Sequence, residues 1–238
     1  MKIKSLLILV LISICSFVQA QLDYSIFDKK FNFYVANDLG RNGYYDQKPI
    51  AELMGTMGEE IGPEFVVATG DVHHFEGVRS VNDPLWMTNY ELVYSHPELM
   101  IDWFPVLGNH EYRGNTQAVL DYTHVSRRWT MPDRYYTRTF EDNGATIRIV
   151  WIDTAPLIDK YRNESDKYPD ACKQDINKQL SWLESVLANA KEEWIIVAGH
   201  HPSMPILRKK RASAWICKNV WIPPAETQGR HVHLRTHP

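Results

Sequence analysis

The sequence contains few cysteines, and this scarcity excludes a fold that depends on a disulfide framework. Only Cys15, Cys172 and Cys217 occur in 238 residues. Cys15 lies in an N-terminal segment that we expect to be removed, so a Cys172–Cys217 disulfide is the only pairing left, and it is less favoured than two free thiols. We therefore expect a hydrophobic core to stabilise the chain, which its 44% hydrophobic content permits.

The chain also lacks an excess of positive charge. Lys and Arg total 26 against 29 Asp and Glu, which gives a net charge of -3. This balance argues against nucleic acid as the main partner, because a nucleic-acid-binding face is normally basic. Internal repeats and low-complexity linkers are absent too, so we expect one compact, monomeric domain.

Long apolar runs are absent after the first twenty residues. Residues 1–20 begin with Lys2 and Lys4, continue with the apolar stretch Leu6–Val18 and end in a small-residue cleavage site at Ala20. This pattern is typical of a secretory signal peptide, and the stretch is too short to span a membrane comfortably. We expect cleavage near Ala20, export to the periplasm or the medium, and no stable membrane anchor.

Strand-like runs alternate with helical patterns over the rest of the chain, which is typical of an α/β layered fold. The expected strands are 31–36, 65–69, 103–107 and 194–198, with a hairpin of 135–140 and 146–153 that turns at 142–144. The expected helices are 46–57, 83–94, 116–122 and 175–190.

Four polar clusters follow four of these strands. They are Asn37-Asp38-Leu39-Gly40, Gly70-Asp71-Val72-His73-His74, Gly108-Asn109-His110-Glu111 and Gly199-His200-His201-Pro202. The carboxyl ends of strands are where α/β sheets place their chemistry. Carboxylate, amide and imidazole groups delivered from several strand ends are what a two-metal phosphoesterase site requires.

The acidic members of these clusters also have structural interpretations. Asp38, taken alone, is better explained as a turn or helix-cap residue. Asp71 could belong to a turn as well, although a carboxylate held there can bridge two cations. His74 lies three residues further on and can supply a neutral imidazole to a metal.

The cluster around Asn109 and His110 is more specific. An amide oxygen is a weak metal ligand, and the adjacent imidazole can donate a proton to a leaving alkoxide. His200 fits a further strand-end ligand, while the neighbouring histidines remain open. His201 is either a neighbour of the ligands or a structural hydrogen-bond donor, and His73 either supports the ligands or faces solvent. We place Glu111, His201 and His73 around the site, in contact with substrate or with the ligands.

Together with three further stretches, the clusters resemble the calcineurin-like metallophosphoesterases, and more closely the tartrate-resistant, purple-type acid phosphatases. These stretches are Ser126-Arg127-Arg128-Trp129, Trp151-Ile152-Asp153-Thr154 and Gln179-Leu180-Ser181-Trp182-Leu183. The resemblance runs from about Phe31 to Pro202. It implies a four-layer α/β/β/α sandwich that hydrolyses small phosphomonoesters. A phosphodiesterase or nucleotidase on the same fold and an inactive fragment are the alternatives.

The resemblance also implies a role for each candidate residue. Asp38 would bind the first metal, Asp71 would bridge both metals, and Asn109 and His200 would bind the second. His110 would orient the substrate or protonate the leaving group while a metal-activated water attacks phosphorus. The purple members carry a metal-binding tyrosine where this chain has His74, so we expect a protein that is not purple. The expected cofactor is two metal ions, iron paired with iron, zinc or manganese.

One cluster that the resemblance implies is missing, namely a closing Gly-His-x-His after Pro202. Residues 203–238 contain seven Lys or Arg against one acid, Glu226. Suitable codons for the last nine residues, read one base later, encode Asp-Met-Tyr-Ile-Cys-Gly-His-Ile followed by His or Gln. The opposite offset turns 203–221 into an acidic, helix-forming stretch.

These two offsets predict that residues 203–238 are translated out of frame. The metallophosphoesterase domain would then comprise 21–202 and lack its C-terminal strands and two metal ligands, so we expect weak metal binding and doubtful activity. The alternative is that His231 and His233 supply the closing ligands, although Arg230 stands where glycine should precede them.

Overall fold

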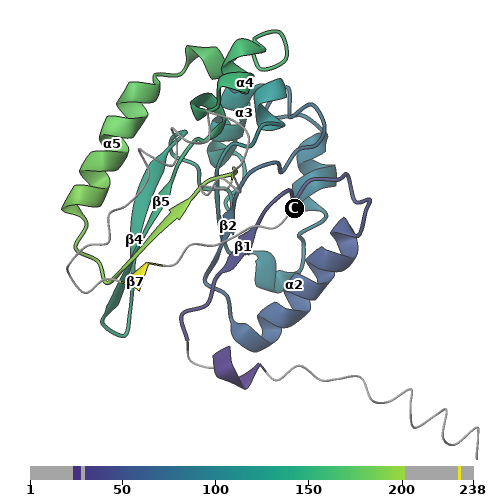
Figure 1. The fold of residues 1–238 in the computed structure, drawn as a ribbon. Coiled ribbons are helices and arrows are strands. Elements are labelled where there is room, and N and C mark those ends of the chain that lie inside the picture. The colour runs from purple at the N-terminus through teal and green to yellow at the C-terminus, as the bar shows by residue number, and fades with distance from the viewer. Residues whose placement is uncertain (1–23, 28–29, 202–229, 232–238) are drawn as a thin grey trace, which may run out of the picture. The chain divides into compact units, whose positions relative to one another are not determined.

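A computed structural model of the chain describes residues 24–27, 30–201 and 230–231 (Figure 1). The chain divides into two units, 1–30 and 31–238. In the first unit the described element is a single 3-10 turn, η1 (Ser25–Phe27). The expected signal peptide, Cys217 and nearly all of the 203–238 tail lie outside the described residues, so the predictions about them stay predictions.

The first sheet of the second unit is parallel. Its strands lie in the order β1 (Tyr34–Ala36), β2 (Phe65–Ala68) and β3 (Asp102–Pro105). The central strand β2 is buried along its whole length, as is usual for a parallel strand covered on both faces. The register pairs Ala36 with Ala68 and Ala68 with Pro105. The three polar clusters that follow these strands therefore emerge at one edge of the sheet.

The second sheet is mixed. β4 (Tyr136–Asp142) and β5 (Ala145–Trp151) form the expected hairpin, which turns at Asn143 and Gly144 with positive φ at both. β6 (Trp194–Ala198) lies parallel to β5. A two-residue strand, β7 (Arg230–His231), pairs in parallel with the start of β6, where the sequence predicted that the sheet would end.

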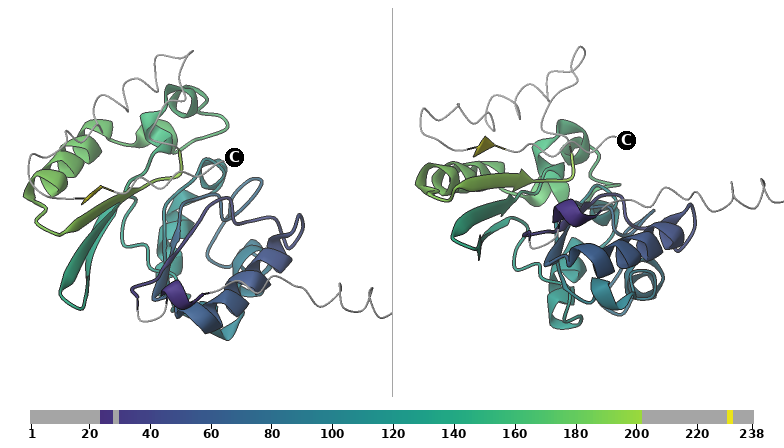
Figure 2. Two further views of the ribbon diagram at one scale, coloured as in Figure 1. Left: turned by 60° about the horizontal axis from the view of Figure 1, so that its bottom comes forward. Right: turned by 90° about the horizontal axis from the view of Figure 1, so that it is seen from below.

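An aromatic core joins the two sheets. Phe65 of the first sheet stacks on Phe140 of the second with ring centroids 4.3 Å apart, and Phe104 lies 5.4 Å from Trp151. Helix α5 (Ile176–Asn189) covers the outer face of the second sheet, where Leu183 packs against residues of β5 and the loop after it. Helix α2 (Gln47–Ile61) covers the first sheet (Figures 1 and 2). The predicted α/β/β/α sandwich is thus confirmed.

The remaining helical elements are short. They are η2 (Met87–Glu91), η3 (Pro97–Leu99), η4 (Glu111–Arg113), α3 (Thr116–Asp121), η5 (Tyr122–His124), η6 (Ala155–Leu157), α4 (Asp159–Asn163) and η7 (Ala171–Lys173). Within the described ranges, none of the helices has the length and apolar character needed to span a bilayer.

The helix predicted over 83–94 is wrong in type and extent. Met87–Glu91 is a π-helix, in which the Leu92 amide donates to the Met87 carbonyl at 3.0 Å. The wider turn buries Tyr90, whose ring packs edge-on against Trp103 and Trp129. Packing of bulky aromatics therefore overrides the regular helical period that the sequence suggested.

Candidate metal centre

Two carboxylates follow neighbouring strands of the first sheet. Asp38 follows β1 and Asp71 follows β2, and each has a φ of 55°, a left-handed conformation that residues other than glycine seldom adopt. The Asp38 amide donates to the Gly70 carbonyl at 3.1 Å, so the two loops run side by side. Such backbone conformations cluster at functional sites, which makes these two residues the first structural indication of a site.

The loop after β3 approaches Asp71 closely because residue 108 is glycine. A Cβ atom on Gly108 would lie 2.2 Å from Oδ1 of Asp71, which no side chain could tolerate without moving the carboxylate. With glycine there, the same Oδ1 accepts a hydrogen bond from the His110 amide at 2.8 Å. The carboxylate of Asp71 is thereby fixed between the two loops.

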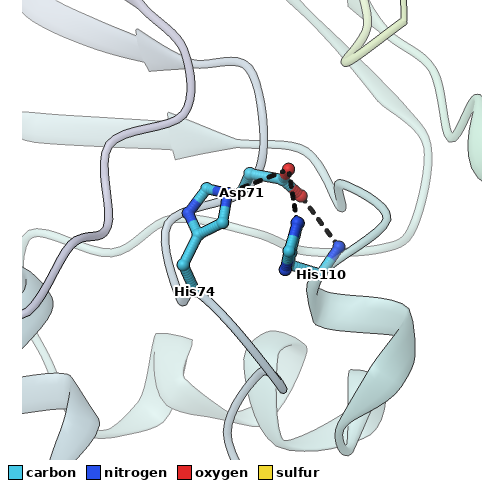
Figure 3. A group of neighbouring side chains, drawn as sticks. All are labelled: Asp71, His74 and His110. Carbon is cyan, nitrogen blue, oxygen red and sulfur yellow. Dashed lines mark hydrogen bonds and ion pairs between the residues drawn. The ribbon is translucent and has the colours of Figure 1, made fainter.

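Three imidazoles point toward the other oxygen of Asp71. Its Oδ2 lies 3.4 Å from Nε2 of His74, 3.7 Å from Nε2 of His110 and 3.3 Å from Nε2 of His200. Figure 3 shows His74 and His110 on either side of the carboxylate. The ligand atoms of Asp71, His74 and His110 all lie within 4.8 Å of one another, so this group could hold a metal ion.

Each of these rings is held on its far side by a backbone carbonyl. The carbonyls belong to Gly40 for His74 (2.7 Å), Phe75 for His110 (2.6 Å) and Thr69 for His200 (2.9 Å). Because a carbonyl can only accept, Nδ1 carries the proton and Nε2 keeps its lone pair when the ring is neutral. Imidazoles that bind metals in proteins are oriented in this way by their second nitrogen.

Asn109 and Asp38 complete the cluster. Oδ1 of Asn109 lies 3.3 Å from Nε2 of His200, and Oδ1 of Asp38 lies 3.6 Å from Nε2 of His74. The Asp38 side chain is 46% exposed, so it marks the open side of an otherwise buried cluster. The structure therefore brings together every residue that the sequence proposed as a metal ligand, together with His110.

Asp71 and the histidines around it shift one another's pKa values. Burial alone would raise the pKa of Asp71, but hydrogen bonds from His200 and His74 hold it well below its usual range. Burial alone would lower the pKa of His200, but the Asp71 carboxylate raises it to about 9, whereas burial lowers the pKa of His110. An ionised carboxylate among imidazole and amide donors fits iron, zinc or manganese by its chemistry.

Tyr161 is a member of the site that the sequence did not reveal. Its hydroxyl lies 3.4 Å from Oδ1 of Asn109 and 3.0 Å from Nε2 of His201. Nδ1 of His201 lies 2.8 Å from the Thr154 hydroxyl, and burial together with the nearby His200 charge lowers the pKa of His201 to about 3. His201 is therefore a neutral hydrogen-bonding partner. Tyr161 comes from the five-residue helix α4, which has no apolar period to predict it.

His73 and Glu111 lie behind the cluster. His73 is fully buried, and its ring packs edge-on to Trp86 with centroids 4.2 Å apart, so the prediction that it might face solvent is wrong. The Glu111 side chain is 1% exposed. Neither residue is placed where it could reach the open side.

Two facing sheets with carboxylate, amide and imidazole groups at their strand ends define a metallophosphoesterase. The calcineurin-like phosphoesterase profile matches residues 31–217, and the chain belongs to this family. The family predicted from the sequence is thus confirmed.

Among individual proteins, the chain is similar to purple acid phosphatases. It is 31% identical over 180 residues to purple acid phosphatase 7 of Arabidopsis thaliana, which covers 73% of this chain and 54% of that protein. It is 35% identical over 164 residues to tartrate-resistant acid phosphatase type 5 of Mus musculus, covering 65% and 48%. The chain therefore spans about half the length of the curated relatives it matches.

A solved structure supports the fold. The protein described as "GAP50 the anchor in the inner membrane complex of Plasmodium" superposes with a TM-score of 0.62 at 24% identity. The similarity covers 80% of this chain and 61% of that one.

Proposed function

We propose that this chain binds two metal ions at the Asp71 cluster and hydrolyses small phosphomonoesters. One observation carries the proposal: three Nε2 atoms converge on Oδ2 of Asp71 while a backbone carbonyl holds each Nδ1. Two bound metal ions would offset the charge of a phosphate and activate a water for attack on phosphorus. The similarity to acid phosphatases supports a monoester as the substrate.

We assign the residues of the cluster to two metal ions by their positions. Asp71 lies between the imidazoles from both sheets, so we assign it to both ions. Asp38 and His74 lie together on one side and would hold one ion, while Asn109 and His200 lie together on the other side and would hold the second. Iron with iron, zinc or manganese is the proposed content.

His110 is the residue to which we assign contact with the substrate. It is 14% exposed, more than either of the other two imidazoles. Its Nδ1 is engaged by the Phe75 carbonyl, so Nε2 can donate a proton to a leaving oxygen only when the ring is protonated. Because burial lowers the pKa of His110, that donor form becomes populated at acidic pH.

Metal titration followed by a substrate panel tests the proposal. The purified 238-residue chain should bind up to two ions when metal is in excess, and should cleave p-nitrophenyl phosphate faster than its diester analogue or a nucleotide. Asp71→Asn should weaken metal binding more than tenfold. Asp102→Asn, at an exposed position of β3, should leave metal binding unchanged.

Three results would contradict the proposal. They are a chain that takes up no metal, a preference for diesters, and an Asp71→Asn variant that binds metal like the unaltered chain. A preference for diesters or nucleotides would still be compatible with the proposed metal centre. It would favour the alternative function predicted from the sequence, a phosphodiesterase or nucleotidase.

A further inference from the structure

We propose that Glu111 is a positioning residue, which ties the loop carrying Asp71 to the loop carrying Asn109 and His110 and thereby sets the spacing of the metal ligands. Its role as a spacer of ligands rests on the metal centre proposed above, whereas the tie between the loops is a property of the protein alone. Glu111 opens η4 directly after His110, and its side chain is 1% exposed.

The carboxylate of Glu111 accepts hydrogen bonds from three backbone amides. Its Oε2 accepts from the amides of Asp71 at 2.9 Å and Gly108 at 2.8 Å, and its Oε1 accepts from the His73 amide at 3.0 Å. Two of these amides belong to the loop after β2 and one to the loop after β3. Hydrogen bonds to a charged group are stronger than those between neutral groups, so the carboxylate is a strong link between loops about forty residues apart in sequence.

A second bond runs in the opposite direction. Oδ1 of Asp71 accepts from the His110 amide at 2.8 Å, while the Asp71 amide donates to Glu111. The two loops are thus cross-linked reciprocally by two acidic side chains. This arrangement occupies Oδ1 of Asp71 and leaves its Oδ2 facing the three imidazoles.

The bound amides depend on this carboxylate for a partner. The Asp71 amide donates to the buried Glu111 carboxylate, and a buried donor without a partner is costly. A glutamine at position 111 has one oxygen instead of two, so it can serve either the Oε2 amides or the His73 amide. Its NH2 group would then face the amide or amides that are left. Because both groups are donors, no hydrogen bond could form between them.

The ring of His73 lies beside the Glu111 carboxylate. Its Nδ1 lies 3.7 Å from Oε1, and both side chains are almost completely buried. Within the described part of the chain neither nitrogen of His73 has a hydrogen-bond partner. Both oxygens of Glu111 accept from backbone amides, so its side chain serves as a hydrogen-bond acceptor in the folded protein.

Direct contact with substrate is the alternative role for Glu111. It conflicts with the 1% exposure of the side chain and with the engagement of both oxygens by backbone amides. A residue in contact with substrate should affect turnover and leave metal affinity intact. A positioning residue should affect metal affinity.

Glu111→Gln in the full chain tests the proposal, with Glu91→Gln as the matched control. Glu91 carries a partly buried carboxylate too, paired with Arg128 at 2.7 Å, and it lies outside the candidate centre. Two measurements are made on each protein. Titration with Co²⁺, followed by its visible absorption, reports metal affinity and ligand geometry, and amide hydrogen exchange without metal reports the three amides.

We expect Glu111→Gln to weaken Co²⁺ binding by about 10- to 100-fold and to speed exchange at the amides of Asp71, His73 and Gly108. Glu91→Gln should change neither Co²⁺ affinity nor exchange at these three amides, even if this variant unfolds more easily. Unchanged Co²⁺ affinity in Glu111→Gln, or unchanged exchange at the three amides, would overturn the proposal. If the unaltered chain binds no Co²⁺, the proposed metal centre fails, and the exchange measurement still decides whether Glu111 ties the loops.

Discussion

Asp153 makes the stability of the chain depend on pH. It is fully buried at the end of β5, where it accepts a hydrogen bond from the Tyr112 hydroxyl. Burial raises the pKa of Asp153 from 3.8 to about 7. The folded state therefore keeps the proton while the unfolded state loses it. Below about pH 4 the free energy of unfolding is therefore not reduced by ionisation of Asp153. As the pH rises from about 4 to about 7, this free energy falls by up to roughly 4 kcal/mol.

Asp153→Asn removes this dependence, because the amide keeps an acceptor for Tyr112 and does not ionise. Urea unfolding of both proteins at pH 5 and pH 8 measures the effect. Between pH 5 and pH 8, the free energy of unfolding of the unaltered chain should fall by roughly 2–3 kcal/mol more than that of the variant. A difference between the proteins that does not change with pH would show that Asp153 ionises normally when folded.

At the scale of elements, Gln179 fastens helix α5 to the end of β5. Its Oε1 accepts from the Asp153 amide at 2.8 Å, and its Nε2 donates to the Asp153 carbonyl at 3.0 Å. Gln179→Ala should cost roughly 2–4 kcal/mol, because two buried backbone groups lose their partners. Asn177→Ala, on the exposed face of the same helix, should change stability by less than about 0.5 kcal/mol. Chemical denaturation of both variants checks this, and equal losses would contradict the role of Gln179.

The elements themselves were largely predictable. The strand 194–198, the hairpin turning at 142–144 and the helix 175–190 follow from short-range patterns of apolar and turn residues, and the structure has them within a residue or two. The helix predicted over 83–94 failed because contacts with distant aromatics, such as Trp129 against Tyr90, decide the local winding.

The candidate site was predictable only in part, for the same physical reason. Strand-end positions predicted which residues would meet, because parallel strands in register bring their carboxyl ends to one edge. The contact of Tyr161 with Asn109 and the inward turn of Glu111 depend on side-chain directions in loops and short helices. No periodicity in the sequence encodes those directions.

At the scale of the whole molecule, the site depends on the packing of the two sheets. Asp71 follows β2 of the first sheet, whereas His200 follows β6 of the second. Their side chains meet at 3.3 Å because the aromatic core holds the sheets face to face. A segment that alters the second sheet beyond β6 should therefore also affect the candidate metal ligands.

Within the tail after Pro202, the described strand β7 pairs with β6. We predict that residues 203–238 are read out of frame. Sequencing the gene across about codons 200–225 should reveal one additional base near codon 202 and another near codon 222. The restored frame would supply Gly-His-x-His and hence two further imidazoles. If the gene contains neither base, a sequencing error is excluded as the cause of the altered frame. An intact frame in the gene of a related strain would indicate a true mutation.

Metal affinity then distinguishes the two forms of the protein. A chain carrying the restored tail should bind Co²⁺ about 10- to 100-fold more tightly than the 238-residue chain, because each added imidazole supplies a ligand and excludes water. Replacing both restored histidines by alanine should return the affinity to that of the 238-residue chain, which separates the loss of ligands from the loss of a folded sheet. Equal affinity of the restored and 238-residue chains would mean that Asp38, Asp71, His74, Asn109 and His200 suffice for the centre.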